Sequence, residues 1–301
     1  MLLKAPCKIN LTLRILSKRA DGYHEVSSHM RAIGLYDDVS VTISEFLPAS
    51  NSSEDIIISI KTDNPEIQDG PENLAWKAAA LAKDKFIKKT WSGRIDIHIN
   101  KRIPIAAGLG GGSADAAAVL LGIASVLAPE VDISELCALG TKLGADIPFC
   151  ILACAVANPS LEYQGATSAL AEGIGELLTP IPTEEKAWVV LVKPEIGINT
   201  KEVYMLYDEG EKNTSVSEND LEEPCARTWQ EVAEMISSLK KICEKENAVN
   251  AKIQLSGSGP TVFAYFGEKQ FGDSAQTSAR LVCENAKAVF SDCFVCLTEA
   301  L

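Results

Sequence analysis

The sequence predicts an α+β protein of two domains, and three observations support this class. The chain has 301 residues, of which 47% are hydrophobic and 23% charged, enough for two ordinary hydrophobic cores. Segments with the two-residue period of strands alternate with segments of helical spacing, but without a strict βαβ order. A second series of strands and helices begins near Ala187. We therefore expect two mixed units rather than one doubly wound sheet.

The N-terminal half begins with a strand in which apolar and polar residues alternate. Ile9 and its apolar neighbours point one way, so Lys8 and Asn10 share the polar face. A turn at residues 18–22 leads into a second extended stretch that reaches residue 43. Further strands are expected at residues 55–61 and 94–99, and helices at residues 72–88, 113–127 and 132–144. Asp132, with Glu135 three residues later, is typical of a helix start.

The C-terminal half shows the same mixture of elements. Strands are expected at residues 187–193, 252–255, 261–266 and 294–297, and helices at residues 200–207, 228–245 and 274–288. Residues 208–223 are polar and acidic, which predicts an exposed loop.

Charge and composition indicate which partners and which cellular compartment to expect. The formal net charge of −13 argues against nucleic acid or an anionic membrane as the main partner. No apolar run is long enough to span a bilayer, and the N-terminus has no charged leader before an apolar core, so we expect a cytoplasmic protein. The nine cysteines lie mostly in apolar stretches, which is typical of reduced, buried thiols.

Residues 108–113 read Gly-Leu-Gly-Gly-Gly-Ser and run directly into an alanine-rich helix. Glycine backbone N–H groups can converge on an anion, and the helix dipole adds positive charge there, so the segment predicts a phosphate site, with Ser113 as a cap of the helix. A tight structural turn is the alternative. The Lys that follows a Walker loop is missing, and Ser113 replaces the third glycine of the dinucleotide fingerprint.

Two further segments are candidates for function. Asp146 lies in a short apolar connection after Gly144, where a carboxylate is costly unless it is hydrogen-bonded or paired, although a cap or an Asx turn would also explain it. Residues 255–261 read Leu-Ser-Gly-Ser-Gly-Pro-Thr between two strands, which by themselves indicate a hairpin-like turn.

Taken together, three segments resemble the signature motifs of the GHMP small-molecule kinases. The first is Ala-Pro-Cys-Lys-Ile-Asn-Leu-Thr-Leu at residues 5–13, extended by Arg-Ala-Asp-Gly-Tyr-His-Glu at residues 19–25; the second covers residues 104–118 and the third residues 255–261. Residues 144–149 resemble the segment that carries the catalytic aspartate of the family. The Asp-Gly-Tyr-His extension resembles members whose acceptor is a diphosphocytidyl sugar alcohol.

The resemblance implies a two-domain GHMP kinase fold. Residues 1–155 would form the ATP-binding domain, with ribosomal protein S5 domain 2-like topology, and residues 156–301 a C-terminal α/β sandwich domain. It also implies phosphoryl transfer from ATP, with Mg²⁺, to the 2-hydroxyl of diphosphocytidyl methylerythritol. No nucleic acid or membrane partner is expected, and the chain would be a monomer or a homodimer.

The resemblance implies the following site. Asp146 would accept the proton of the substrate hydroxyl, and Lys8 would polarise that hydroxyl. ATP would lie against Pro104, Ala107, Gly108, Leu109, Gly110, Gly111, Gly112, Ser113, Asn73 and Trp76, although a packed helix face would also explain Asn73 and Trp76. The substrate would lie against Asn10, Tyr23, His24, Thr200, Tyr204, Gly257 and Ser258, although core packing would also explain Tyr204. Ser113 and Ser258 are candidates for phosphate or metal neighbours, and the Mg²⁺ ligands are not assigned.

The chain departs from the family pattern after the aspartate. The family continues from Pro-Phe through a short strand and a Gly-Gly turn, whereas here residues 150–172 intervene before Gly-Ile-Gly-Glu. The extra residues 155–163 would form a surface loop or lie against the active site. Three alternatives stay open: another GHMP kinase acting on homoserine, mevalonate or a sugar, a non-catalytic ligand sensor of the same fold, and an oxidoreductase.

Overall fold

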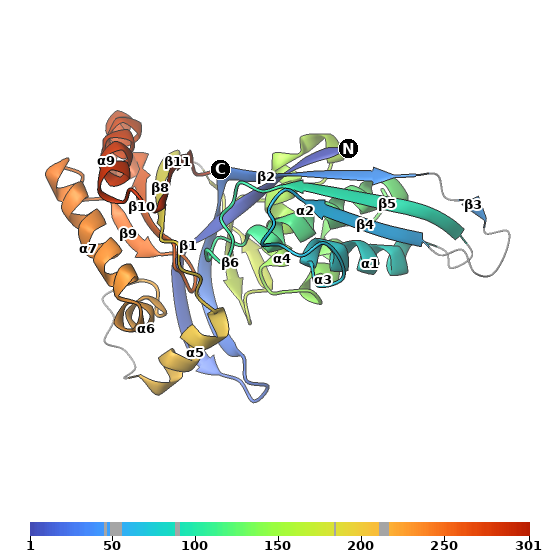
Figure 1. Cartoon of the computed structure of the whole chain (residues 1–301), viewed down its shortest axis with the longest axis horizontal. Helices are drawn as coiled ribbons and strands as arrows, with labels where there is room; N and C mark the ends of the chain where they lie inside the picture. The colour runs from blue at the N-terminus through green and yellow to red at the C-terminus, as the bar shows by residue number, and fades with distance from the viewer. Residues whose placement is uncertain (45–46, 49–55, 88–90, 184, 211–216) are drawn as a thin grey trace. The chain divides into compact units, whose positions relative to one another are not determined.

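The computed structural model describes residues 1–44, 47–48, 56–87, 91–183, 185–210 and 217–301 (Figure 1). These residues form two compact units. The first unit consists of Met1–Cys7, Leu35–Ile103 and Gly110–Thr167, and the second of Lys8–Gly34, Pro104–Leu109 and Ser168–Leu301. Each unit is therefore built from separate stretches of the chain. The predicted domain boundary at residue 155 stays a prediction.

The described strands begin with two long ones that contribute to both units. They are β1 (Leu2–Lys18), β2 (His24–Ile43), β3 (Leu47–Pro48), β4 (Ile56–Thr62), β5 (Trp91–Asn100), β6 (Ser168–Glu172), β7 (Leu177–Pro180), β8 (Ala187–Lys193), β9 (Lys252–Leu255), β10 (Val262–Gly267) and β11 (Phe294–Glu299).

The helices occur singly or in groups between these strands. They are α1 (Leu74–Phe86), α2 (Gly111–Leu127), α3 (Ile133–Thr141), α4 (Ile147–Ala157), α5 (Thr200–Glu209), α6 (Glu222–Thr228), α7 (Gln230–Lys245), α8 (Glu268–Phe271) and α9 (Ala275–Val289), with short 3₁₀ turns η1 (Pro159–Leu161) and η2 (Gly272–Ser274).

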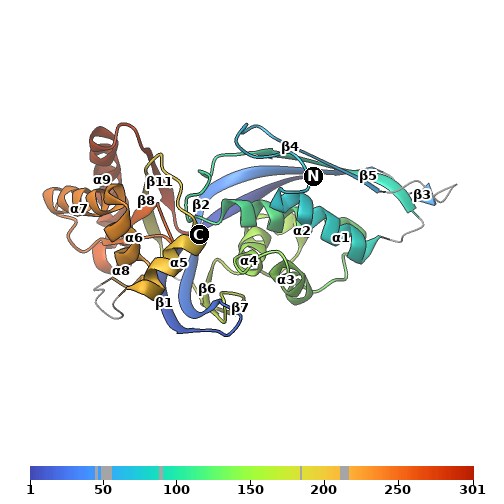
Figure 2. The ribbon, with the colours of Figure 1, turned by 60° about the horizontal axis from the view of Figure 1, so that its bottom comes forward.

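In the first unit, β5 pairs antiparallel with the end of β2 and parallel with β4. Ile95, Ile97 and Ile99 of β5 are buried, as their alternation with polar residues predicts. Helices α1 to α4 cover one face of these strands (Figure 2). Helix α2 packs between α1 and α4, and the alanines of its first half allow this close approach.

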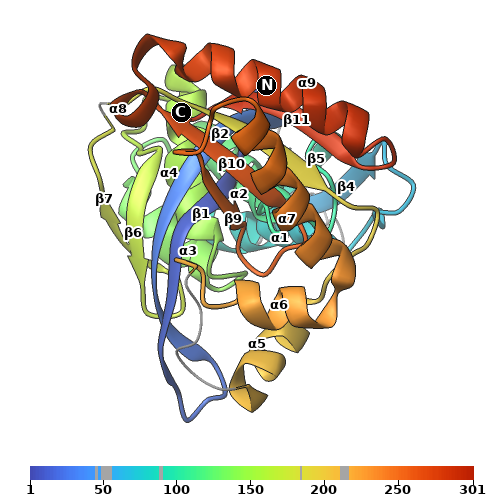
Figure 3. The ribbon, with the colours of Figure 1, turned by 90° about the vertical axis from the view of Figure 1, so that its left-hand side faces the viewer.

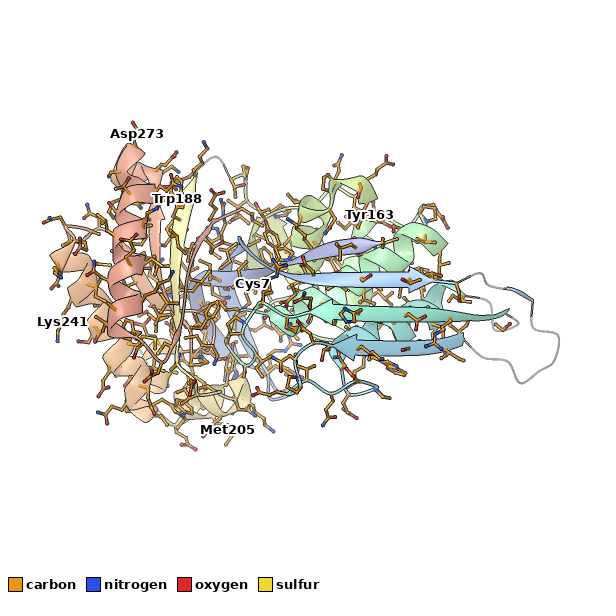
Figure 4. The ribbon with its side chains drawn as sticks, turned by 45° about the horizontal axis from the view of Figure 1, so that its top comes forward. Cys7, Tyr163, Trp188, Met205, Lys241 and Asp273 are labelled. Carbon is orange, nitrogen blue, oxygen red and sulfur yellow. The ribbon has the colours of Figure 1, made fainter. Side chains whose placement is uncertain are left out.

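In the second unit, β11, β8, β10 and β9 form an antiparallel sheet in that order. Helices α7 and α9 pack against one face of it (Figure 3). Helix α7 turns Val232, Met235 and Leu239 into the core, while Lys241 lies exposed on its outer side (Figure 4). The start of β2 pairs with β6, and β6 pairs with β7.

The predicted α+β class is confirmed, and most predicted elements occur within a few residues of their expected bounds. Asp132 is the N-cap of α3 and accepts the Ser134 N–H at 2.7 Å, as expected. The role of Ser113 as a cap is wrong: α2 begins two residues earlier, because Gly110 takes the N-cap position with φ 71°. A residue with a Cβ adopts this left-handed backbone only at a cost.

The segment after Asp146 is helical, whereas the family pattern has a short strand there. The extra residues 155–163 contain the end of a helix and a 3₁₀ turn. Residues 147–157 form α4, and η1 follows. The Asn158 side chain donates to the Lys4 carbonyl at 2.8 Å and accepts from the Lys4 N–H at 2.9 Å, both in the first unit. Tyr163 packs against the core of the same unit (Figure 4). The insertion therefore lengthens a packed helical region.

The predicted exposed loop at residues 208–223 is also partly wrong. Asp208 belongs to α5, Asn219 is fully buried, and the Asp220 carboxylate accepts from the Arg14 guanidinium at 2.8 Å. Residues 211–216 lie outside the described residues. Polar side chains in this segment therefore form hydrogen bonds within the protein. Composition alone does not distinguish such residues from residues that are exposed to solvent.

Two other expectations concern the whole chain. None of the nine cysteines is in a disulfide bond and most are buried, which agrees with the prediction of reduced thiols. Among the helices that the structure describes, none is both long and apolar enough to cross a membrane.

Candidate active site

The three motifs predicted to form the site meet partly within the second unit. Gly108 of the glycine loop packs against the turn at residues 255–261: a Cβ added there would lie 2.8 Å from the Gly259 carbonyl oxygen and would overlap that of Ser256. The Ser256 hydroxyl also donates to the Gly108 carbonyl at 3.1 Å. The two glycine turns are therefore one contact surface, and the predicted hairpin-like turn has a partner that its own sequence did not indicate.

Lys8 lies beside the same turn. Its backbone N–H donates to the Leu109 carbonyl at 2.9 Å, and its ammonium would be 3.6 Å from a Cβ at Gly257. The side chain is only 5% exposed, although it points from the polar face of β1. Burial of an ammonium group costs free energy unless hydrogen-bond partners or an opposite charge compensate for the lost water.

Asn10 is one of those partners. The Lys8 ammonium donates to Asn10 Oδ1 at 2.7 Å, the Asn10 amide donates to the Ser28 hydroxyl at 2.8 Å, and Ser28 donates to the Thr12 carbonyl at 2.7 Å. This chain of bonds fixes the direction of the ammonium. Both ends of the Asn10 side chain are thus engaged within the protein, and its contact with a substrate stays a prediction.

The turn of the third motif is supported by one predicted residue outside it, Thr200, and by one that was missed, Asn219. The Ser258 and Thr200 hydroxyls are hydrogen-bonded at 2.8 Å, which joins the turn to the first residue of α5. The buried Asn219 amide donates to the carbonyls of Leu255 and Gly257, each at 2.8 Å. Asn219 lies in the segment predicted as a solvated loop, so no sequence signal identified it.

His24 is held by α5. Its Nε2 is 2.8 Å from Asp208 Oδ1, and its ring stacks on Tyr204 with the ring centroids 4.9 Å apart. The Lys18 ammonium donates to the other Asp208 oxygen at 2.6 Å. Burial raises the pKa of Asp208, but the bonds from Lys18 and His24 outweigh it and leave this pKa below its ordinary value. Asp208 is therefore an ionised partner that orients His24.

Tyr23 differs from its neighbour in exposure. It is 60% exposed in the turn between β1 and β2, and its backbone N–H donates to the Asp21 carboxylate at 3.1 Å. An exposed aromatic ring beside an ordered turn is suited to stacking on a planar ligand. Tyr204 contacts the His24 ring, so it belongs to the same group of aromatic side chains, but its own contact with a ligand stays a prediction.

The second half of the glycine loop lies in the first unit and begins α2. No side chain caps this helix, and its first turn carries no acidic residue. Gly112 is exposed, and Gly111 and Ser113 are half-buried. Their N–H groups and the dipole of a 17-residue helix are suited to binding an anion, and the binding of ATP here stays a prediction. Pro104, Ala107 and Leu109 precede this segment in the chain, and their contact with a nucleotide stays a prediction.

Asp146 takes the N-cap position of α4 in the first unit. Its side chain makes no capping hydrogen bond, unlike that of Asp132 at the start of α3. The capping alternative therefore does not explain why this residue is an aspartate. Its half-buried carboxylate lies at the N-terminal, positive end of α4.

Asn73 and Trp76 have structural roles in the first unit. The Asn73 side chain caps α1 by accepting from the Ala75 N–H at 2.9 Å. The Trp76 indole packs against the core and donates to the Ile58 carbonyl at 3.4 Å. These contacts agree with the alternative of a packed helix face, and contact of the two residues with a nucleotide stays a prediction.

One buried charge cluster was missed by the sequence analysis. Lys101 binds Asp37 and Asp115 in the first unit, next to the start of α2. A signal was present, because Asp115 is the only charged residue in an apolar helix, the same pattern that singled out Asp146. No group of three or more His, Cys, Asp or Glu side chains able to hold a metal ion occurs in the described parts of the chain.

Comparison with known proteins places the chain among kinases. The family model for the GHMP kinases N terminal domain matches residues 73–154. A 4-diphosphocytidyl-2-C-methyl-D-erythritol kinase of Clostridium tetani is 38% identical to this chain and covers 93% of it and 95% of its own length. The protein of the same name from Geobacter metallireducens is 36% identical and covers 99% of this chain and 98% of its own length.

Solved structures agree. A crystal structure of 4-(cytidine 5′-diphospho)-2C-methyl-D-erythritol kinase matches the whole of both chains with a TM-score of 0.71 and 28% identity. A homoserine kinase from Cytophaga hutchinsonii has a TM-score of 0.64 at 14% identity, which shows a shared fold alone. The family, the two-domain α+β fold and the assignment to small-molecule kinases, all predicted from the motifs, are confirmed. This chain belongs to the GHMP kinase family, among its 4-diphosphocytidyl-2-C-methyl-D-erythritol kinases.

Proposed function

We propose that the chain transfers the γ-phosphoryl group of ATP to the 2-hydroxyl of 4-diphosphocytidyl-2-C-methyl-D-erythritol, a step of non-mevalonate isoprenoid biosynthesis. The observation that supports it most is the convergence of Lys8, Gly108 and Gly257 in the second unit. A buried ammonium, aligned by Asn10 beside two glycine turns, is suited to a reaction between phosphate and a hydroxyl. Relatives with 36 to 38% identity over nearly the whole chain carry the name of this reaction.

The glycine loop would bind the triphosphate. Phosphoryl transfer needs positioning and charge neutralisation more than covalent chemistry, and uncapped N–H groups at a helix start supply both. Mg²⁺ takes most of its ligands from phosphate oxygens and water and needs only one or two protein groups. The Ser113 hydroxyl is a ligand of the kind it accepts and lies in the first turn of α2, where the phosphates would bind, so the chain fits such an ion. When bound, Mg²⁺ would neutralise charge on the phosphates.

Lys8 and Asp146 would act on the acceptor hydroxyl. Lys8 would donate a hydrogen bond to the hydroxyl oxygen and stabilise the charge that develops there. Asp146, whose side chain does not cap α4, would accept the hydroxyl proton as the O–P bond forms. The hydrogen bond from Lys8 to Asn10 supports the first role, and the lack of a capping hydrogen bond at Asp146 supports the second.

The cytosine would be recognised by the aromatic group of the second unit. The exposed ring of Tyr23 would stack on the base. His24, oriented by Asp208 and packed against Tyr204, would hydrogen-bond its polar edge. Because the Asp208 carboxylate occupies Nε2, only Nδ1 and the backbone of His24 are left for the ligand.

The test is a coupled assay of ADP release with ATP, Mg²⁺ and the diphosphocytidyl substrate. We expect Asp146→Asn to lower kcat at least 100-fold, because proton acceptance is lost, while the Kd of ATP changes less than about threefold. Asp132→Asn is the matched control: it also changes an N-cap aspartate in the first unit, but there the side chain caps its helix and Asn caps equally well. Its kcat should stay within about twofold of wild type.

Each outcome bears on a different part of the proposal. Wild-type protein that binds ATP but releases no ADP with this substrate would contradict the reaction and favour a ligand sensor. Release with homoserine or mevalonate instead would change the substrate but not the class of enzyme. Equal activity of Asp146→Asn and wild type would remove Asp146 from its role.

A further inference from the structure

Asn219 is a fully buried polar side chain of the second unit that makes three hydrogen bonds. Its amide nitrogen donates to the carbonyls of Leu255 and Gly257, each at 2.8 Å, and its Oδ1 accepts the Leu221 N–H at 2.9 Å. An ionised aspartate has no donor, and a serine hydroxyl has only one. Neither side chain supplies these three bonds, so the position requires an amide.

The backbone around Asn219 is bound to β1. The Leu13 N–H donates to the Glu218 carbonyl at 2.8 Å, and the Asp220 N–H donates to the Leu13 carbonyl at 2.9 Å. These two bonds form a parallel bridge between Leu13 and Asn219. Leu13 is the last residue of the first motif and lies in the middle of β1. Asn219 therefore connects the strand of the first motif to the turn of the third motif.

The glycine that Asn219 holds packs beside Lys8. A Cβ at Gly257 would lie 3.2 Å from Asn10 Oδ1 and 3.6 Å from the Lys8 ammonium. Gly257 has φ 56°, a left-handed conformation that glycine adopts without strain. A glycine peptide also rotates more easily than that of other residues, so its direction depends on what holds its carbonyl. At Gly257 this role falls to the Asn219 amide.

The Gly257 carbonyl and the Ser258 N–H belong to one planar peptide group. In a trans peptide these two bonds point in nearly opposite directions, so the Ser258 N–H points away from Asn219. Within the part of the chain that the structure describes, this N–H donates no hydrogen bond, although Ser258 is only 7% exposed. A backbone donor without a partner is rare in a buried residue. The Ser258 N–H is therefore available to a ligand.

The surroundings of Ser258 favour the acceptor as that ligand. Its hydroxyl is bonded to that of Thr200, the first residue of α5, and the same helix carries Tyr204, whose ring stacks on His24 in the proposed cytosine site. The Ser258 N–H is thus linked to the cytosine side through α5 and comes one residue after the glycine beside Lys8. In the acceptor, a diphosphate joins the cytidine to the sugar alcohol. Backbone N–H groups bind such charged oxygens strongly.

We propose that Asn219 is a positioning residue for the acceptor: by holding the Gly257 carbonyl, it keeps the Ser258 N–H directed at a phosphate oxygen of the diphosphocytidyl group. The inference rests on the proposed function, which supplies the acceptor. Asn219 itself does not touch the ligand. Loss of its amide frees the Gly257 carbonyl to turn, the Ser258 N–H turns with it, and the acceptor loses a hydrogen bond. A hydrogen bond to a charged group typically contributes about ten- to a hundredfold in affinity.

The experiment compares cytidine diphosphate with cytidine, which lacks the phosphates. Both are titrated by calorimetry with a non-hydrolysable ATP analogue present, so that the nucleotide site is occupied. In Asn219→Ser the Kd of cytidine diphosphate should rise about tenfold or more, whereas the Kd of cytidine should change less than about threefold. In the coupled assay, the KM for the acceptor should rise by a similar factor, while the KM for ATP and kcat should change less. A merely structural asparagine would not separate the two ligands.

Asn158→Ser is the matched control. The Asn158 amide also donates to two carbonyls at 2.8 Å, those of Lys4 and Cys154, and its oxygen accepts the Lys4 N–H at 2.9 Å, but all these bonds lie in the first unit. The two serine variants therefore lose the same set of hydrogen bonds, and we expect similar decreases in melting temperature. Only Asn219→Ser should change the ratio of the two Kd values.

Asn219→Asp is a second variant with less change in packing. It keeps the shape of the side chain and can still accept the Leu221 N–H, but an ionised carboxylate donates nothing to the two carbonyls. The Kd of cytidine diphosphate should again rise more than that of cytidine.

The outcomes separate this inference from the proposed function. Wild type that binds cytidine diphosphate but releases no ADP with ATP and the acceptor would contradict the proposed reaction, while the ratio of the Kd values would still test Asn219. Wild type that binds cytidine diphosphate no more tightly than cytidine would overturn the inference even if neither variant folds. Equal changes in the two Kd values, or the same ratio in Asn219→Ser and Asn158→Ser, would also overturn it.

Discussion

Gly108 and Gly111 lie three residues apart in the same loop, yet different atoms surround them. Gly108, with φ 72°, is covered by main-chain oxygens of Ser256 and Gly259 in the second unit. Gly111 has ordinary helical backbone and is covered by the side chains of Ile103 and Lys101 in the first unit. One end of the loop is fixed by a second turn of backbone, and the other by a buried charge cluster.

This difference shows that the two ends of one glycine-rich loop can be held by different kinds of contact. Backbone oxygens at the Gly108 end cannot move without disturbing the turn of the third motif, so that end has a fixed shape. The ionisable side chains at the Gly111 end respond to pH and to nearby charge. Substitutions at each end therefore distinguish a fixed backbone contact from a charged one.

Lys101→Met should have the largest effect on stability. It removes the ammonium and leaves two buried carboxylates with no cation, which typically costs about 3 to 5 kcal/mol. Asp115 has a raised pKa in the folded state, and loss of Lys101, which lowers this pKa, raises it further, so the folded variant is stabilised by a bound proton at low pH and loses stability as pH rises. Urea unfolding should therefore show a larger loss at pH 8 than at pH 5.5.

The double variant Lys101→Met with Asp115→Asn is the control for this prediction. It removes one of the two unpaired carboxylates, so it should recover part of the stability and lose most of the pH dependence. A loss in Lys101→Met that is equal at the two pH values would contradict the charge explanation and indicate a packing defect instead.

The contacts at the two ends of the loop also explain which features could be predicted from the sequence. The helix after the loop and the strand before it follow from local periodicity, and both were placed correctly. The exact start of α2 was not, because a left-handed Gly110 rather than the Ser113 hydroxyl ends the loop. Both residues are compatible with a helix start, and only the backbone path decides between them.

Contacts between residues that lie far apart in the chain were harder to predict from the sequence. Lys8, Asn10 and Gly257 were found because the family motifs name them, although nothing local joins residues nearly 250 positions apart. Asp37 and Lys101 belong to no motif, and Asp208 was assigned to a solvated loop because acidic composition is the same for a solvated and an ion-paired residue. Burial of a charged side chain depends on long-range packing, which the sequence pattern does not contain.

Gly108→Ala should be the next largest change. Its Cβ would overlap main-chain oxygens that cannot rotate away, and the positive φ adds backbone strain, so we expect a loss of about 2 to 4 kcal/mol. Gly272→Ala is the control: it also has positive φ but no atom within 4 Å of the added Cβ, so it measures strain alone. Similar urea midpoints for the two variants would show that the contact with Ser256 and Gly259 does not matter.

Gly111→Ala should have the smallest effect, and its neighbour gives a matched comparison. The added methyl group would press on Ile103 and approach Lys101, which are side chains that can shift by a few tenths of an ångström, so we expect a loss of about 1 kcal/mol. Gly112→Ala adds the same group to the same helical turn with no atom within 4 Å, and should stabilise the helix by about 0.5 to 1 kcal/mol. Thermal unfolding measures this difference, and identical melting temperatures of the two variants would show that the contact of residue 111 with the Ile103 and Lys101 side chains does not matter.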